Sequence, residues 1–304
     1  MNIAKSKIGW IGVGRMGRPM CINLVKAGFS VTVYDKDAAR IAAVLGSGVS
    51  AAASPAALAA QSDLVISMIF DDAALQDVVL GPAGVLGAMR PGAPYIDMST
   101  VSPAASEDIA RHLAECHVPY LRAPVSGTVV LAETASLSTY VSGPKDVFEA
   151  CLPVFQALTA KQKYVGEGEE ARLVKLTINL IVQMATAVLG EALAFGTRAG
   201  LDRSMLVDAI NDSIVASPHY QTRAEWFKHR ERSPVADLAM TTKDMDLALA
   251  VAQAHGAALP IASLVRQYLA ISKSLGKETK GVMALAEILE DINPDHSRNI
   301  IEDD

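Results

Sequence analysis

Cysteine is scarce in this sequence, and its few copies lie far apart. The chain has only Cys21, Cys116 and Cys151, an odd number without regular spacing. This predicts buried free thiols in a reducing compartment rather than a disulfide framework. His112, Cys116 and His117 resemble half of a metal site, but no second pair at ligand spacing follows, so we predict no bound metal.

Clusters of positive charge are also missing. Lysine and arginine number 27 against 33 acidic residues, the formal net charge is −6, and the isoelectric point lies near 5.6. No basic run is longer than a few residues. We therefore expect neither nucleic acid nor an anionic membrane surface as a partner.

A long uninterrupted apolar run is absent as well. The segment 173–195 is apolar but contains Lys175, Asn179, Gln183 and Glu191, which favours a helix of a globular domain over a membrane span. The first residues, MNIAKSKIGW, lead directly into an expected strand, which leaves no room for a signal peptide. The expected location is the cytoplasm.

The sequence does have enough hydrophobic residues to form the cores of two domains. Its 304 residues are 51% hydrophobic. Residues 1–168 alternate short apolar runs with helical stretches, which is typical of a mainly parallel, doubly wound sheet of the Rossmann type. The expected strands are Ile8–Ile11, Val31–Tyr34, Leu64–Ile69, Ala93–Asp97, Pro119–Leu121 and Ser138–Ser142.

Residues 169–304 have helical periodicity and no strand-like run. The segment Leu173–Ala199 is far longer than the average helix of about 11–12 residues. Shorter helices are expected at Met205–Ile210, Thr241–His255 and Ser263–Leu275. The predicted fold class is therefore α/β, with an N-terminal Rossmann-type sheet, a long connecting helix and an all-α C-terminal domain. So long an apolar helix predicts an exposed stripe, and hence a homodimer or homotetramer formed through the helical domain.

A glycine-rich turn follows the first expected strand. Residues 12–17 read GVGRMG, and Asp35 follows Gly17 by 18 residues, close to the roughly 20 expected between such a turn and the acid that binds an adenosine ribose. Backbone N–H groups and the dipole at a helix start favour a pyrophosphate. We therefore predict dinucleotide binding, and the alternative is a turn that only lets helix and strand pack closely.

Asp35 also bears on which dinucleotide binds. A carboxylate at this position accepts bonds from both ribose hydroxyls and repels a 2′-phosphate, which favours NAD over NADP. Lys36, the next residue, would tolerate that phosphate if it turned inward. Alternatively, Asp35 only caps the helix that follows.

Polar residues follow two further expected strands. Ser99 and Thr100 stand at the carboxyl end of a strand, where doubly wound sheets bind ligands, although Ser99, Thr100 or Ser102 could instead cap the next helix. Ser126 and Gly127 belong either to a turn whose hydroxyl and N–H groups suit a carboxylate or to an ordinary turn.

Lys175 and Asn179 are four residues apart in the long helix and therefore share one face. A lysine in an apolar stretch commonly extends its amine to solvent. If Lys175 instead faces a cleft between the domains, desolvation and a nearby cationic nicotinamide would favour its neutral form. It could then exchange a proton with a substrate oxygen.

Together these stretches resemble the β-hydroxyacid dehydrogenase family, which includes 3-hydroxyisobutyrate dehydrogenase and tartronate semialdehyde reductase. The resemblance rests on the order and intervals of the glycine turn, DMSTVSP at 97–103, APVSG at 123–127, K-x-x-x-N at 175–179 and Lys243-Asp244. It covers nearly the whole chain. It implies an NAD-dependent oxidoreductase acting on a small hydroxy carboxylic acid or its semialdehyde.

The resemblance also implies roles for individual residues. The cofactor would bind Gly12, Val13, Gly14, Arg15, Met16, Gly17, Asp35, Lys36, Thr100 and Lys243. The substrate would bind Ser126, Gly127 and Thr128, with its carboxylate on the first two. Lys175 would be the general acid/base, and Asn179 would orient the substrate hydroxyl or carbonyl.

The sequence departs from the family pattern where the substrate would bind. Thr128 stands where a second glycine is usual, Glu169 and Ala171 replace glycines before the lysine, and Ala236 replaces a pocket aromatic residue. These changes leave hydride chemistry intact in principle and put the identity of the acid in doubt.

Arg122 is the sharpest departure, because the family usually has aspartate before APVSG. One hypothesis places its guanidinium beside Ser126 as a clamp for a second anionic group of the substrate. The other places it at the surface, facing solvent or paired with a carboxylate such as Glu115.

Two other functions stay open at this point. An imine reductase has a similar two-domain plan, but the presence of both Lys175 and Asn179 favours the hydroxy acid. A catalytically silent NAD-binding protein is the second alternative. An intact Lys175 speaks against it, whereas the altered Thr128 and Ala236 keep it open.

Overall fold

The structure, a computed structural model, describes residues 6–229 and 237–292. The chain divides into two compact units, Met1–Leu176 and Thr177–Asp304. Every strand of the described residues belongs to the first unit, and the second unit is helical. The predicted fold class, a Rossmann-type sheet followed by a long helix and a helical domain, is confirmed.

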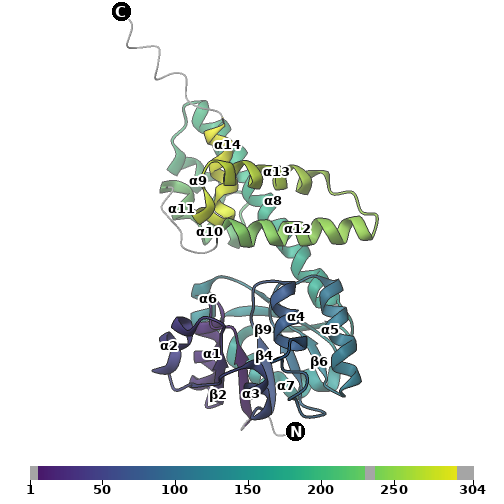
Figure 1. Ribbon diagram of the computed structural model, residues 1–304. Helices are drawn as coiled ribbons and strands as arrows, with labels where there is room; N and C mark the ends of the chain where they lie inside the picture. The colour runs from purple at the N-terminus through teal and green to yellow at the C-terminus, as the bar shows by residue number, and fades with distance from the viewer. Residues whose placement is uncertain (1–5, 230–236, 293–304) are drawn as a thin grey trace, which may run out of the picture. The chain divides into compact units, whose positions relative to one another are not determined.

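Parallel strands form the main part of the sheet. They are β1 (Lys7–Ile11), β2 (Ser30–Tyr34), β3 (Ser50–Ala51), β4 (Leu64–Ser67), β5 (Tyr95–Asp97) and β6 (Tyr120–Arg122). Their order is β3-β2-β1-β4-β5-β6. Figure 1 labels β2, β4 and β6 of this series. The direction of winding reverses between β1 and β4, and sheets of this kind bind ligands at the carboxyl ends of such a strand pair.

A second group of strands extends the sheet beyond β6. It consists of β7 (Val125–Ser126), β8 (Leu137–Ser142) and β9 (Thr159–Gly166). Strand β8 runs antiparallel to β6 and β7 and parallel to β9. Strand β9 was not predicted. It pairs only with β8 and exposes Lys161 and Lys163, so it has the charged sequence of an edge strand and no apolar run.

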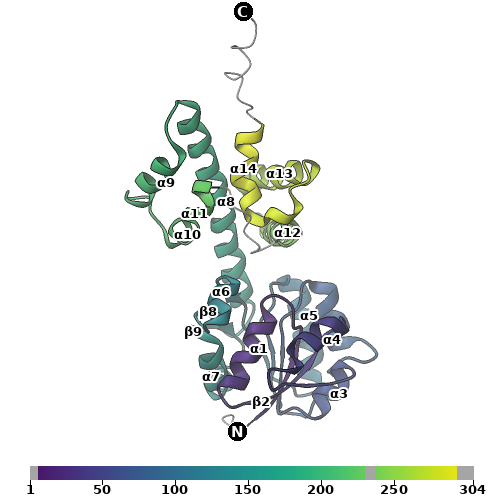
Figure 2. The same cartoon turned by 90° about the vertical axis from the view of Figure 1, so that its left-hand side faces the viewer.

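Helices cover both faces of the sheet. They are α1 (Gly17–Lys26), α2 (Ala38–Leu45), α3 (Pro55–Ala60), α4 (Asp72–Leu80), α5 (Pro103–Glu115), α6 (Val129–Glu133) and α7 (Lys145–Leu158). Figure 2 shows α1 and α7 on one face and α3, α4 and α5 on the other. The buried clusters follow this division, with Leu24 of α1 and Phe155 of α7 in one and Leu75 of α4 and Ile109 of α5 in the other.

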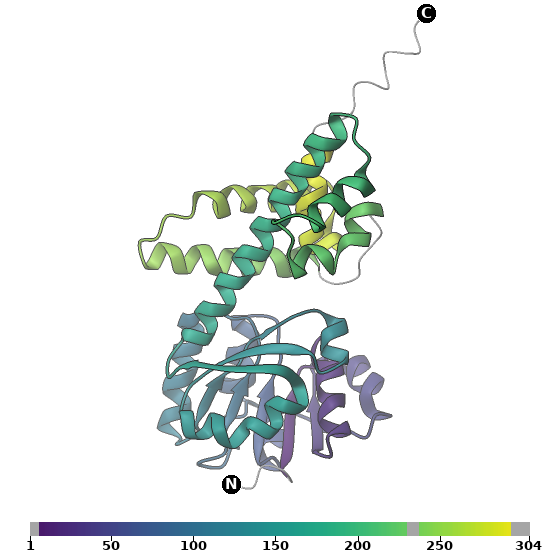
Figure 3. The same cartoon turned by 180° about the vertical axis from the view of Figure 1, so that it is seen from behind.

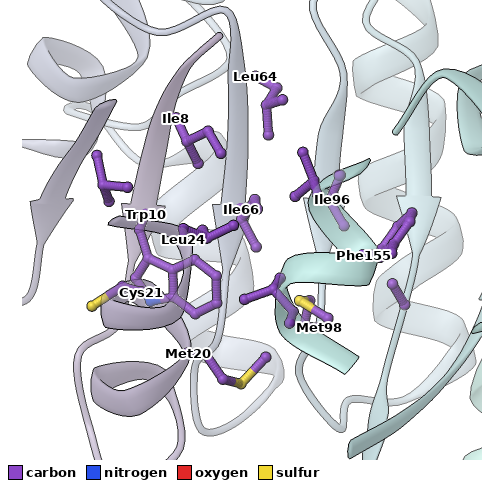
Figure 4. Packing of buried hydrophobic residues seen from close by; sticks show 14 of the residues in the cluster. Ile8, Trp10, Met20, Cys21, Leu24, Leu64, Ile66, Ile96, Met98 and Phe155 are labelled. Atoms are coloured by element: carbon purple, nitrogen blue, oxygen red, sulfur yellow. The ribbon is translucent and has the colours of Figure 1, made fainter. Parts of the chain in front are cut away.

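Trp10 of β1 connects the core to the glycine turn. Its side chain is fully buried in the cluster that contains Met20, Leu24 and Phe155 (Figure 4). The indole N–H donates a hydrogen bond of 2.9 Å to the carbonyl oxygen of Gly12. A buried indole N–H needs an acceptor, and here that acceptor belongs to the turn. Core packing of β1 therefore also fixes the turn.

The cysteines are free, but only two of them are buried. Burial raises the pKa of the Cys21 thiol on α1 and of the Cys151 thiol on α7 to about 12. Cys116 is exposed just past the end of α5. The prediction of burial is wrong for Cys116, because the chain leaves the helix there at the protein surface.

The second unit is built from helices. Helix α8 (Glu170–Arg198) begins in the first unit and continues without a break into the second. It is followed by α9 (Arg203–Asn211), α10 (Pro218–Gln221), α11 (Ala224–His229), α12 (Leu238–Ala254), α13 (Pro260–Ser274), the 3₁₀ helix η2 (Glu278–Met283) and α14 (Ala284–Asp291). Figure 3 shows α12 and α13 side by side, and α13 also packs on α14.

Two apolar clusters hold the second unit together. One packs Ala187 of α8 against α12, α13 and α14, and the other packs Leu193 of α8 against Trp226 and Phe227 of α11. The predicted helices correspond to α8, α9, α12 and α13. Helix α14 was not predicted, because residues 284–289 are all buried and so lack an alternation of polar and apolar faces.

Glu287 of α14 is a buried acid held by two lysines. Its carboxylate accepts hydrogen bonds from Lys277 at 2.8 Å and from Lys280 at 2.7 Å. Burial alone would raise the pKa of Glu287, but the two ammonium groups outweigh it and lower that pKa. The ionised carboxylate thus links the segment before η2, η2 itself and α14.

Helix α8 is the one helix of the described ranges that is long and apolar enough to cross a membrane by length and composition. An 18-residue window has a mean hydropathy of 1.6, and 33% of it is buried inside the protein. Core helices of globular proteins meet the same criterion, so this observation is weak evidence for a membrane span.

Candidate cofactor and substrate site

The turn between β1 and α1 has a geometry that requires glycine at two positions. Gly12 has φ +94°, and a Cβ atom there would lie 2.2 Å from the carbonyl oxygen of Met68. A Cβ atom on Gly17 would lie 1.9 Å from the carbonyl oxygen of Gly12. Both contacts are sterically forbidden, so the turn packs α1 directly on the ends of β1 and β4.

The same turn is suited to an anion on its other side. A Cβ atom on Gly14 would meet only Nη1 of Arg40, at 3.6 Å, so the backbone is open to close approach there. Met16, at the start of α1, forms no side-chain cap, and of the first helical residues Arg18 already donates its N–H to the carbonyl of Gly14 at 2.9 Å, which leaves the N–H of Gly17 for another acceptor. Residues 12–17 therefore fit a pyrophosphate, in addition to the packing role.

Asp35 is joined to the glycine turn. Its carboxylate accepts hydrogen bonds from the backbone N–H of Val13 at 2.9 Å and of Asp37 at 3.0 Å. The cap of α2 is Asp37, whose side chain accepts from Ala39, so the alternative that Asp35 caps this helix is wrong. The Val13 N–H is already bonded to Asp35, so the predicted cofactor contact of Val13 would have to use other atoms.

The side chain of Arg40 lies near Asp35. Arg40 Nη1 lies 3.9 Å from Asp35 Oδ2, and the Arg40 side chain is 53% exposed. Arg15 and Lys36, both predicted to contact the cofactor, are exposed. The site therefore holds one buried acid with one exposed arginine beside it.

The hydroxyl groups after β5 have separate functions. Ser102 caps α5 by accepting from the N–H of Ala105 at 3.0 Å. Ser99 is fully buried, donates to Asp97 at 2.6 Å and accepts from the N–H of Ile69 at 2.9 Å. Thr100, the predicted cofactor contact, is partly exposed and follows Ser99 directly.

Sequence reasoning missed Arg172, whose side chain is only 1% exposed. Its guanidinium donates to the Ser99 carbonyl at 2.6 Å and to the Tyr120 hydroxyl at 2.9 Å, contacts Ser106 Oγ at 3.4 Å, and pairs with Asp97. Burial alone would lower the pKa of Arg172, but Tyr120 and Asp97 outweigh it and raise that pKa.

The segment predicted to bind the substrate lies at the junction of β7 and α6. Ser126 pairs with β8 and is partly exposed, and Gly127 is exposed with φ +144°. Thr128 caps α6 through its hydroxyl, which gives it a structural role that a glycine would lack. Asn23 of α1 donates to the carbonyl of Ala132 in α6 at 2.7 Å, so this segment lies beside the cofactor helix.

Lys175 and Asn179 stand one turn apart on α8. Lys175 is partly buried. Asn179 Nδ2 donates to Asp244 at 2.7 Å, and Lys243 Nζ donates to the other oxygen of the same carboxylate at 2.8 Å. Asp244 therefore orients both Asn179 and Lys243. The sequence indicates Asp244 only as the second residue of the Lys243-Asp244 pair and does not predict this role.

Arg122 occupies neither of the places expected for it. It forms a buried ion pair with Glu169, each side chain 8% exposed, with 2.7 Å from Nε and 2.6 Å from Nη2 to Oε1. Its guanidinium also lies 4.6 Å from the ring centroid of Tyr120. The surface position and a pair with Glu115 are therefore wrong, and the charge that a substrate clamp requires is already neutralised.

Two further expectations concern metal binding and the substrate pocket. Within residues 6–229 and 237–292, no three His, Cys, Asp or Glu side chains are grouped so that they could hold a metal ion. Ala236, expected to replace a pocket aromatic residue, lies outside the described residues.

Two protein-family profiles match consecutive parts of the chain. Residues 7–166 match the NAD binding domain of 6-phosphogluconate dehydrogenase. Residues 169–289 match the profile described as NAD-binding of NADP-dependent 3-hydroxyisobutyrate dehydrogenase. The two matches cover both compact units.

Known proteins resemble the chain over most of its length. It is 31% identical to 2-(hydroxymethyl)glutarate dehydrogenase of Eubacterium barkeri over 285 residues, which cover 93% of this chain and 95% of the relative. It is 30% identical to glyoxylate/succinic semialdehyde reductase 2 of Arabidopsis thaliana, covering 93% and 79%. A 3-hydroxyisobutyrate dehydrogenase from Mycobacterium tuberculosis, solved with L-serine, has a TM-score of 0.84 at 25% identity and covers 94% and 99%.

The buried pair of Arg122 and Glu169 leads to a prediction about stability. Arg122→Ala would leave the Glu169 carboxylate buried without its counter-charge, which costs roughly 3–5 kcal/mol. Urea unfolding should show this loss, whereas Arg90→Ala, which breaks an exposed pair with Asp63, should cost less than about 1 kcal/mol.

A double variant separates pairing from packing. Arg122→Met combined with Glu169→Leu should recover most of the lost stability, because both charges are gone. The substrate clamp would be reinstated if Arg122→Ala left stability unchanged and raised KM selectively for dianionic acids.

Proposed function

The chain belongs to the 3-hydroxyisobutyrate dehydrogenase family of pyridine-nucleotide-dependent oxidoreductases, and on this premise we propose its specific reaction. It moves a hydride between NAD(H) and the carbon that bears the hydroxyl or carbonyl group of a small hydroxy carboxylic acid or its semialdehyde. The observation that carries this proposal is the pair of Lys175 and Asn179 on one helix, with Asn179 oriented through Asp244.

The nicotinamide, when bound, supplies the hydride chemistry, and the residues of the chain supply proton transfer and orientation. Lys175 in its neutral form takes the hydroxyl proton during oxidation, and in its ammonium form returns a proton to the developing alkoxide during reduction. Asn179 orients the oxygen that gains or loses this proton. Ser126 and Gly127 hold the substrate carboxylate.

The hydrogen bond from Asn179 to the Asp244 carboxylate supports the orienting role of Asn179. One N–H of its amide is bonded to Asp244, and the second N–H of the same nitrogen can donate to the substrate oxygen in its hydroxyl, alkoxide or carbonyl form. Lys243, held by the same carboxylate, is proposed to reach the cofactor. Thr100 is proposed to lie beside the nicotinamide half.

Two alternatives have less support. Imine reductases among the similar structures are 21% and 20% identical to this chain, which shows a shared fold alone. A catalytically silent NAD-binding protein would have no use for the oriented Asn179.

The discriminating experiment follows NADH absorbance with a panel of acids and aldehydes: 3-hydroxyisobutyrate, 2-(hydroxymethyl)glutarate, L-serine, glyoxylate and succinic semialdehyde. Tight NADH binding without turnover of any of them would favour the silent protein.

Lys175→Ala should abolish turnover and leave NADH binding nearly intact. The expected decrease in kcat is on the order of 10²–10⁴, the range for loss of a positioned acid/base. Steady-state kinetics and a fluorescence titration of NADH measure the two quantities. Lys163→Ala, an exposed lysine on β9, is the control and should change neither. An equal loss of NADH affinity in Lys175→Ala would make Lys175 structural.

NAD should be preferred over NADP, because the Asp35 carboxylate repels a 2′-phosphate. Asp35→Asn keeps an acceptor for the N–H of Val13 and removes the charge. Loss of one like-charge contact is worth roughly 1–4 kcal/mol, so the ratio of the two kcat/KM values should move toward NADP by about tenfold or more. A wild-type enzyme that uses NADP equally well would contradict this and assign the phosphate to Arg40, which Arg40→Ala would test.

We also propose that the protein forms a homodimer or homotetramer through α8. Ile181, Val188 and Phe195 are 59%, 57% and 77% exposed and recur every seven residues, which places them on one face of the helix. Sedimentation at micromolar concentration should give a mass above the 32.0 kDa of one chain. Val188→Glu with Phe195→Glu should dissociate the assembly, and Leu45→Glu on α2 should not. A clean 32.0 kDa species for the wild type would refute the proposal.

A further inference from the structure

The first turn of α8 carries a buried arginine for which the proposed chemistry has no use. Arg172 reaches acceptors on three other elements: Ser99 and Asp97 at the end of β5, Ser106 on α5 and Tyr120 on β6. A hydrophobic residue would fill the same space without the cost of desolvating a charge. The number and directions of these contacts therefore call for an explanation beyond packing.

The acceptors of Arg172 belong to a hydrogen-bonded chain that ends at the loop after β4, and this loop packs against the cofactor turn. Ser99 receives the N–H of Ile69, the second residue after β4, at 2.9 Å. Asp97 accepts from Ser67, the last residue of β4, at 2.6 Å. The carbonyl of Met68, between these two residues, is the group that a Cβ atom on Gly12 would strike at 2.2 Å. A movement of Arg172 is thus resisted by the same loops that shape the glycine turn.

The position of Lys175 follows from that of Arg172. The two residues are three apart in a continuous helix, so their side chains start about 60° apart around the axis and about 4.5 Å apart along it. Fixing Arg172 on the end of β5 fixes the rotation and height of this turn, and hence the origin of the Lys175 side chain. Ser142, which bonds Gly168 and Ala171, holds the backbone at the start of the helix but reaches no residue beyond it.

We propose that Arg172 is the positioning residue for Lys175, fixing the rotation and height of the helical turn from which the Lys175 side chain extends. The inference rests on the proposed acid/base function of Lys175. It requires arginine and not lysine, because a planar guanidinium with five donors can bind several acceptors in fixed directions, whereas an ammonium group on a flexible stem fixes none of them. Misplacement of a reacting group by about 1 Å can cost on the order of 10²-fold in rate.

The test compares Arg172→Lys, which keeps the charge beside Asp97, with Arg111→Lys, an exposed arginine on α5. In Arg172→Lys we expect kcat to fall about 10- to 100-fold, the Kd of NADH to change less than about threefold, and amide hydrogen exchange of residues 170–176 to accelerate. Arg111→Lys should match the wild type in all three measurements. If Arg172→Lys retains the wild-type kcat, or loses kcat without faster exchange, the proposal is wrong.

Two further measurements keep the test decisive. If Arg172→Lys does not fold, the double variant Arg172→Met with Asp97→Asn takes its place, because it removes both buried charges. It should show the same loss of kcat with NADH binding retained. An unchanged kcat would overturn the proposal. The acylation rate of Lys175 relative to the exposed Lys163, measured by mass spectrometry, should change in both Arg172 variants. This readout needs no turnover, so it tests the positioning role even if the wild type converts none of the acids. An unchanged ratio would again overturn the proposal.

Discussion

The ion pair between Arg172 and Asp97 is the constraint on which the start of α8 depends. Both side chains are withdrawn from water, where a charge is tolerated only if its partner and its remaining hydrogen-bonding groups are satisfied. The carbonyl of Ser99 and the hydroxyl of Tyr120 complete that requirement. Because these acceptors belong to the loop after β5 and to β6, one guanidinium joins the start of the helix to two neighbouring parts of the sheet. The end of β5, β6 and the first turn of α8 are thereby joined through one side chain.

Elements with strong apolar patterns could be predicted from the sequence, and so could the glycine turn and Asp35, because their signals lie within about 30 consecutive residues. The edge strand β9 and the buried helix α14 could not, since one is charged and the other has no polar face. The ion-pair partners of Arg172 and Arg122 could not be predicted from the sequence either. Nothing in a linear sequence relates residue 97 to residue 172, and an arginine in a buried pair has the same local pattern as one at the surface.

Two departures from the family pattern explain each other once the structure is known. The resemblance leads one to expect an acid at position 122 and a glycine at position 169, and the structure pairs Arg122 and Glu169 in one buried ion pair. Each substitution alone would place an uncompensated charge beneath the start of α8, whereas together they are neutral. One oxygen of Glu169, Oε2, still has no hydrogen-bond partner, so the pairing is less complete than that of Arg172. Departures of this kind change the support of the site and not its reacting groups.

The boundary between the two compact units falls between Leu176 and Thr177, inside an unbroken helix. Lys175 and Asn179 therefore belong to different units but share one stretch of backbone hydrogen bonds. Their separation is set by the pitch of that helix, whatever orientation the units adopt. The helix therefore acts as a fixed spacer between the backbone positions of Lys175 and Asn179, across the boundary of the two units.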